Sequence, residues 1–207
     1  ERTWKDVDGR VTAELERLRG AGGTVRVLTG TVTSPSTRAA VARFLGAFPG
    51  GRHVAYDALS ASALLDAHGT AFGARVLPRY RLERATVILG VEADFLGTWI
   101  SPVELTHGWR AGRTLEGTPP RLSFHAQVES ALSLTGSNAD RRLRVAPGQV
   151  GPFVAHLAAR VAAKTSRPAP SPADPCPVAP EALDGLVDRL VRARGTAVVL
   201  CGINDPD

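Results

Sequence analysis

The stretch from Thr86 to Val91 reads TVILGV and is almost entirely apolar. A strand that is apolar on both faces is typical of a parallel sheet covered by helices on each side, whereas an exposed antiparallel strand alternates. Two acidic residues, Glu92 and Asp94, follow it within three positions. We therefore expect a buried parallel strand with carboxylates at its carboxyl end, where α/β proteins place ligand-contacting side chains.

Strand-like and helix-like segments alternate on both sides of this stretch. Ser34 followed by Pro35 is typical of an N-cap and the first residue of a helix. The alternation predicts an α/β, Rossmann-like three-layer domain with a mainly parallel sheet. Apart from 86–91, the predicted strands are 24–28, 53–56, 122–126 and 196–201. The predicted helices are 8–19, 35–45, 60–71, 102–112, 150–163 and 180–194.

A proline-rich segment interrupts this order near the end of the chain. Its prolines favour an extended linker over helix or sheet. They are Pro168, Pro170, Pro172, Pro175, Pro177 and Pro180. We therefore expect an α/β domain over 1–165, a linker over 166–180, and over 181–207 the helix and first strand of a second, truncated nucleotide-binding-like unit. The chain begins without Met, and we expect it to be a fragment.

The composition excludes several classes of protein. Hydrophobic residues make up 43% and charged residues 22% of the chain, which is typical of a globular protein and not of a disordered one. No apolar run approaches the roughly 18 residues that span a bilayer, so we expect no membrane insertion. The net charge is +5, but the arginines are scattered and aromatic residues do not interleave with them, which argues against nucleic-acid binding.

The usual catalytic and metal-binding motifs are missing. The two cysteines, Cys176 and Cys201, form no C-x-x-C pair, which excludes an internal four-cysteine site; we expect Cys201 to be a buried thiol, and a disulfide between the two remains open. The five histidines have neither H-x-x-x-H nor H-E-x-x-H spacing, and no serine lies in G-x-S-x-G. The sequence therefore predicts no metal site and no catalytic residue.

Two kinds of ligand-binding position remain as candidates. The loop from Gly30 to Thr37 joins a strand to a helix, and its amides and hydroxyls could hold an anion; the alternative is a well-capped helix start. Asp57 and Asp94 follow predicted parallel strands and could bind ribose hydroxyls, although Asp94 could equally cap the turn after it. The hydroxyls of the loop belong to Thr31, Thr33, Ser34, Ser36 and Thr37.

Four stretches resemble a known family. They read RVLTGTVTSPSTRAAVARFL from Arg26, VAYDALSASALLDAHGTAFG from Val54, LERATVILGVEADFLGTWISPVELTHGWRAGR from Leu82 and ESALSLTGSNADRRLRVAPG from Glu129. The chain resembles the molybdopterin oxidoreductases of the dimethyl-sulfoxide-reductase family, and within it the iron–sulfur subunit of bacterial alternative complex III, a quinol-oxidising respiratory complex. The resemblance covers the molybdopterin-like half of that subunit only.

The resemblance implies a scaffold more than an enzyme. Active relatives use molybdopterin guanine dinucleotide and an N-terminal four-cysteine cluster motif that this chain lacks. The iron–sulfur subunit keeps the fold without molybdenum, and its clusters lie in regions not present here, so we expect no cofactor. The implied partners are other subunits of a membrane-associated respiratory complex, and the implied location is peripheral, on the periplasmic side of the cytoplasmic membrane.

Ser60 aligns with the position where active relatives place their metal ligand. A single alkoxide without two pterins cannot hold molybdenum, and the alternative for Ser60 is an N-cap role. The candidate set is therefore a vestigial pterin or nucleotide site. Its members are Gly30, Ser34, Ser36, Thr37, Asp57, Ser60 and Asp94. Three functions stay open: a cofactor-free scaffold, part of an active molybdopterin oxidoreductase using Ser60, and a stand-alone nucleotide-binding domain.

Overall fold

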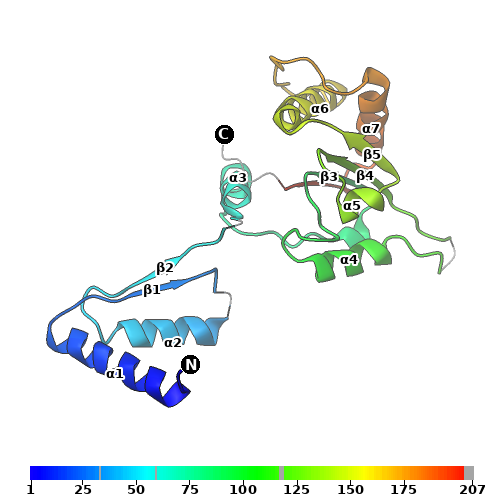
Figure 1. Cartoon of the computed structure of the whole chain (residues 1–207). Helices are drawn as coiled ribbons and strands as arrows, with labels where there is room; N and C mark the ends of the chain where they lie inside the picture. Colours follow the sequence, from blue (N-terminus) through cyan, green and yellow to red (C-terminus); the bar gives the residue numbers. More distant parts are fainter. Residues whose placement is uncertain (33, 59, 117–118, 203–207) are drawn as a thin grey trace. The chain divides into compact units, whose positions relative to one another are not determined.

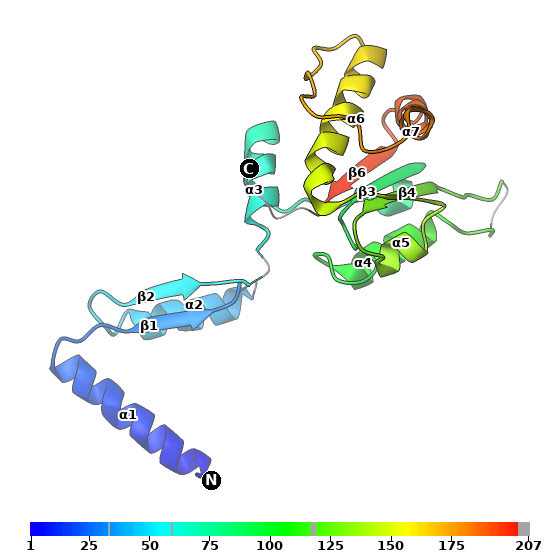
Figure 2. The same ribbon diagram turned by 45° about the horizontal axis from the view of Figure 1, so that its top comes forward.

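The computed structural model describes residues 1–32, 34–58, 60–116 and 119–202. The chain forms two compact units, Glu1–Ser60 and Ala61–Asp207. Figures 1 and 2 together label their helices and strands. No helix among the described residues is long and apolar enough to cross a membrane.

The N-terminal unit is a helix followed by a β-α-β motif. Its elements are α1 (Trp4–Gly20), β1 (Arg26–Thr29), α2 (Pro35–Leu45) and β2 (Arg52–Ala55). The two strands pair in parallel, as the crossover through α2 requires. A capping box between Thr3 and Asp6 begins α1, four residues before the predicted start. Ser34 and Pro35 begin α2 as predicted.

The second unit is a three-layer α/β domain. Its helices are α3 (Ser62–Phe72), α4 (Pro102–Ala111), α5 (Leu134–Ser137), α6 (Val150–Lys164) and α7 (Pro180–Arg192). Its strands are β3 (Val87–Val91), β4 (Phe124–Glu129), β5 (Arg141–Arg144) and β6 (Ala197–Cys201). Short 3₁₀ turns precede β3 (Leu82–Arg84) and α6 (Pro147–Gln149). All strand pairs described are parallel, in the order β5-β4-β3-β6. The predicted mainly parallel α/β fold is confirmed.

Two apolar layers hold the sheet between its helices. Figure 2 shows α6 and α7 on one face, with α4 and α5 on the other. Leu89 and Val128 face Phe153 of α6 and Leu186 of α7. On the opposite face, Ile88 and its neighbours pack with residues of α4 and of the loop after β3. Because β3 is buried at every position, its VILGV sequence had to be apolar on both faces.

The predicted division of the chain differs from the observed one. The sequence predicted that 181–207 opens a second unit after a linker, but β6 pairs residue by residue with β3, and α7 packs in the same apolar layer as α6. The break lies instead between Ser60 and Ala61. Proline content marked a chain segment without regular structure, and such a segment need not separate domains.

Candidate functional site

The carboxyl ends of the parallel strands gather polar side chains at one edge of the second unit. The chain runs from β3 outward to β4 and β5 and then returns to β6 on the other side of β3. The strand order therefore reverses between β3 and β6. In open α/β sheets, ligands bind outside the carboxyl ends of the strands at such a reversal. Glu92, Asp94 and Glu129 are the acidic residues that end or follow β3 and β4.

Asp94 is bound by the loops around it. One carboxylate oxygen accepts from the Thr135 amide at 3.1 Å and from the Thr135 hydroxyl at 2.8 Å, and the other accepts from the Thr98 hydroxyl at 3.1 Å. Burial alone would raise the pKa of Asp94, but the hydrogen bonds from Thr135 and Thr98 outweigh it and lower the pKa below its usual value. A Cβ on Gly97 would overlap this carboxylate, so a larger residue there would displace it from its partners.

Glu129 is buried at the end of β4 and is equally well bound. Its oxygens accept from the Ser133 hydroxyl at 2.6 Å, the Ser133 amide at 3.2 Å and Arg142 Nε at 2.5 Å. Its side chain is 2% exposed. Burial favours the neutral acid, but the bonds from Ser133 and Arg142 prevail and lower the pKa of Glu129. A Cβ on Gly136 would overlap Glu129 Oε1.

The reversal point itself is tightly packed. Glu92 has a φ of +50°, a left-handed conformation that costs a non-glycine residue about 1 kcal/mol, and its Oε1 accepts from the Ser130 amide at 2.7 Å. The Gly202 amide donates to the Val91 carbonyl at 2.9 Å. A Cβ on Gly202 would overlap the Glu92 carbonyl oxygen, so the backbone after β6 approaches the backbone after β3 as closely as glycine allows.

An aromatic pair and a thiol lie beside the same strands. The rings of Tyr80 and Trp99 are 5.5 Å apart between centroids. Burial and the nearby Cys201 raise the pKa of the Tyr80 hydroxyl. Cys201 is exposed and unbridged, so the expected buried thiol is wrong: β6 lies at the edge of the sheet, where the end of the strand is not covered.

The predicted anion loop of the N-terminal unit is a capped helix start. Ser34 accepts from the Thr37 amide at 3.3 Å, and its hydroxyl lies 2.9 Å from that of Ser36. Thr33 lies outside the described residues. Gly30 has a φ in the ordinary range, and a Cβ there would lie 3.1 Å from Asp57 Oδ1.

The carboxylate of Asp57 accepts hydrogen bonds from the same loop. Its Oδ1 accepts from the Thr31 amide at 2.8 Å, and its Oδ2 accepts from the Thr31 hydroxyl. These two bonds lower the pKa of Asp57 below its usual value. The structure thus brings Asp57 to the loop after β1, where its carboxylate supports that loop.

Ser60 lies at the end of the N-terminal unit, one residue before the N-cap of α3. That N-cap is Ala61, so α3 begins one residue later than the N-cap position considered for Ser60. Asp94 belongs to the other unit. The predicted site residues therefore fall into separate units. Among the described residues, no group of three or more His, Cys, Asp or Glu side chains is arranged to hold a metal ion.

Sequence reasoning missed Glu129, Ser133 and Thr135, which carry most of the network. The signal was available in β4, where His125, Gln127 and Glu129 alternate with apolar residues. Strand alternation places these three side chains on one face. All three are fully buried, so this face of a central strand is polar and the opposite face is apolar.

Comparisons of the sequence with protein-family models and with curated proteins find no match.

Proposed function

We propose that this chain is a cofactor-free scaffold domain in the iron–sulfur subunit of a respiratory electron-transfer complex, and that it is not itself catalytic. The observation that carries the proposal is that the acidic side chains at the carboxyl edge of the sheet are already hydrogen-bonded within the chain. Asp94 and Glu129 each accept three hydrogen bonds from the chain's own side chains and amides. An edge built to hold a dinucleotide would instead present free acceptors and donors toward solvent.

Releasing these carboxylates for a ligand would be unfavourable. Glu129 is buried, and moving it away from Ser133 and Arg142 would leave a cation and two donors without partners, at about 1–3 kcal/mol per neutral group and more for the charge. Gly97 and Gly136 leave room for the acidic side chains as they now lie. The sequence around this edge is therefore adapted to its internal bonds.

The proposed partners are other subunits of the complex, and the proposed location is the periplasmic side of the cytoplasmic membrane, as a peripheral protein. The chemistry that such a subunit needs comes from iron–sulfur clusters elsewhere in the assembly. In this role residues 61–207 supply a rigid α/β layer, and neither nucleic acid nor lipid is a proposed ligand.

Elemental analysis of the intact gene product, combined with fluorescence detection of released pterin, tests this function. Iron without molybdenum or pterin would support the scaffold. Stoichiometric molybdenum with two pterins per chain would contradict it, would establish the oxidoreductase alternative, and would make Ser60 the first residue to substitute.

One observation favours a second function, which is binding of a nucleotide. The reversal of strand order between β3 and β6 is where α/β proteins bind nucleotides. A ligand of the native state raises the melting temperature by mass action. If the chain is a scaffold, adenine or guanine nucleotides at millimolar concentration should leave the melting temperature unchanged. A rise of several degrees that Asp94→Asn abolishes would establish the nucleotide alternative.

A further inference from the structure

The N-terminal unit leaves one face of its sheet uncovered. Figures 1 and 2 show α1 and α2 on the same side of β1 and β2. Parallel sheets in folded proteins have both faces covered. Within 1–60, Phe48 is the one side chain that is buried, among the residues that the structure describes. A two-stranded sheet with so small a core is too weak to be stable by itself.

The uncovered face carries an apolar strip. Leu28 pairs in register with Val54, so their side chains share a face, and Tyr56 continues that face because its amide donates to the Thr29 carbonyl at 2.8 Å. Leu28 is 70% exposed, Val54 43% and Tyr56 71%. On the opposite face, Val27 and Thr29 are partly buried. The strip is therefore the side of the sheet that lacks its helix.

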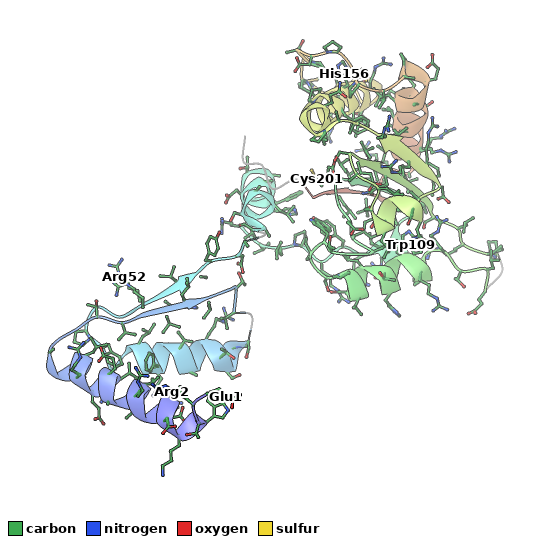
Figure 3. The ribbon with its side chains drawn as sticks, in the orientation of Figure 1. Glu1, Arg2, Arg52, Trp109, His156 and Cys201 are labelled. Atoms are coloured by element: carbon green, nitrogen blue, oxygen red, sulfur yellow. The ribbon has the colours of Figure 1, made fainter. Side chains whose placement is uncertain are left out.

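Two arginines flank the strip at the start of the strands. Arg26 pairs with Arg52 in register, and Figure 3 shows Arg52 directed away from α1 and α2. Among the residues that the structure describes, the Arg26 guanidinium donates to the carbonyls of Val25 and Gly50. Neither guanidinium forms a salt bridge within the part of the chain that the structure describes. Like charges on adjacent strands repel, so this end of the face attracts carboxylates.

We propose that this face binds an amphipathic α-helix of a separate polypeptide. Its apolar stripe covers Leu28, Val54 and Tyr56, and its acidic side chains face Arg26 and Arg52. Two strands about 4.8 Å apart present a strip that one helix, about 10 Å across, covers fully. A second copy of the chain would bring arginines to arginines, and the chain's net charge of +5 also favours an acidic partner. The inference rests on the assembly role proposed above and names its contact surface.

Binding of designed helical peptides to the full chain tests the proposal. One probe carries a leucine stripe flanked by glutamates, and its twin has lysines in place of the glutamates. Fluorescence anisotropy at low salt should show binding of the glutamate probe, at least about tenfold tighter than its twin. Leu28→Asp and Arg52→Glu should each weaken binding by about tenfold or more. Arg38→Glu, an equal charge change on the exposed part of α2, should leave it within about twofold.

Three results would overturn the proposal. The first is failure of both probes to bind, and the second is equal binding of the two. The third is concentration-dependent self-association that Leu28→Asp abolishes, which would assign the face to a second copy. All three substitutions are at exposed positions, and circular dichroism confirms that each variant is folded. None of these outcomes depends on molybdenum or pterin content, so the scaffold function and the docking surface can fail independently.

Discussion

His125 is a fully buried histidine whose two ring nitrogens have no hydrogen-bond partner of ordinary geometry in the described part of the chain. The ring packs against Phe95, at 5.2 Å between centroids, and edge-on to Trp109 at 6.1 Å. Burial and, to a smaller extent, the nearby Arg113 cation lower the pKa of His125 to about 4, against the opposing effect of Asp140. His125 is therefore neutral in the native protein.

This residue makes stability fall on mild acidification. The unfolded chain binds a proton at His125 near pH 6.5 and the native chain near pH 4, so the stability present above pH 6.5 is lost as the pH falls toward 4. The loss amounts to about 3 kcal/mol at most. Urea titrations at pH 7.5, 6 and 5 should show a decline in the wild type that is smaller in His125→Leu. Asp94 and Glu129, whose pKa values are also lowered, reduce stability only below about pH 4.5. If stability fell equally with pH in the wild type and in His125→Leu, the decline could not be assigned to His125.

Gly136 tests the network around Glu129. An alanine Cβ there would overlap the Glu129 carboxylate, whose position is fixed by Ser133 and Arg142. We expect Gly136→Ala to lower the free energy of unfolding by about 2–3 kcal/mol, because the carboxylate must leave its partners. Gly185→Ala is the matched control, since a Cβ there meets nothing within 4 Å on α7. It should stabilise by about 0.5–1 kcal/mol in the same urea titration.

The burial of Leu200 tests whether strand β6 belongs to the second unit. Leu200 is fully buried against Ile88 and Leu105, while its neighbour Val199 is 52% exposed. We expect Leu200→Ala to lower the free energy of unfolding of the β3–β4 sheet by about 2–4 kcal/mol, and Val199→Ala by less than about 1 kcal/mol. Thermal melts followed by near-ultraviolet circular dichroism of Trp99 and Trp109 measure both. If Leu200→Ala left the tryptophan signal and its midpoint unchanged, β6 would belong to a separate unit.

Elements with a strong apolar pattern or a clear capping signal were predictable, whereas β5 and α5 were not. β3, α6 and α7 were predicted to within two residues because burial imposes their patterns. β5 was missed because its sequence, RRLR, is that of a charged edge strand, in which only Arg142 and Leu143 are partly buried. The four-residue helix α5 is too short to show a helical period.

The candidate site was predictable only where a side chain follows an apolar strand. Asp94 was identified in that way, and the structure places it in the network at the carboxyl edge. Its partner Thr135 is 41 positions away, and no local pattern connects the two. Glu129 could be recognised only once β4 was known to be central, because a polar alternation on an edge strand would indicate solvent exposure.

At the scale of the whole molecule, the two units differ in how much core they contain. Residues 61–207 have apolar layers on both faces of a four-stranded sheet. Residues 1–60 have a two-stranded sheet with helices on one side. Local stability follows the number of buried apolar contacts, so the backbone hydrogen bonds of the two sheets should open with different free energies.

Hydrogen–deuterium exchange of the full chain measures this difference. Amides of β3 and β4 should exchange only through global unfolding, at about 5 kcal/mol or more, because both faces of these strands are covered. Amides of β1 and β2 should exchange through local opening at a much lower free energy, because Leu28, Val54 and Tyr56 remain in water. Adding the glutamate-flanked helical peptide should slow exchange in β1 and β2 and leave β3 and β4 unchanged, with Leu28→Asp as the variant in which this protection is lost. Equal protection of both sheets without peptide would show that β1 and β2 already have sufficient core, and the open face would then need no partner.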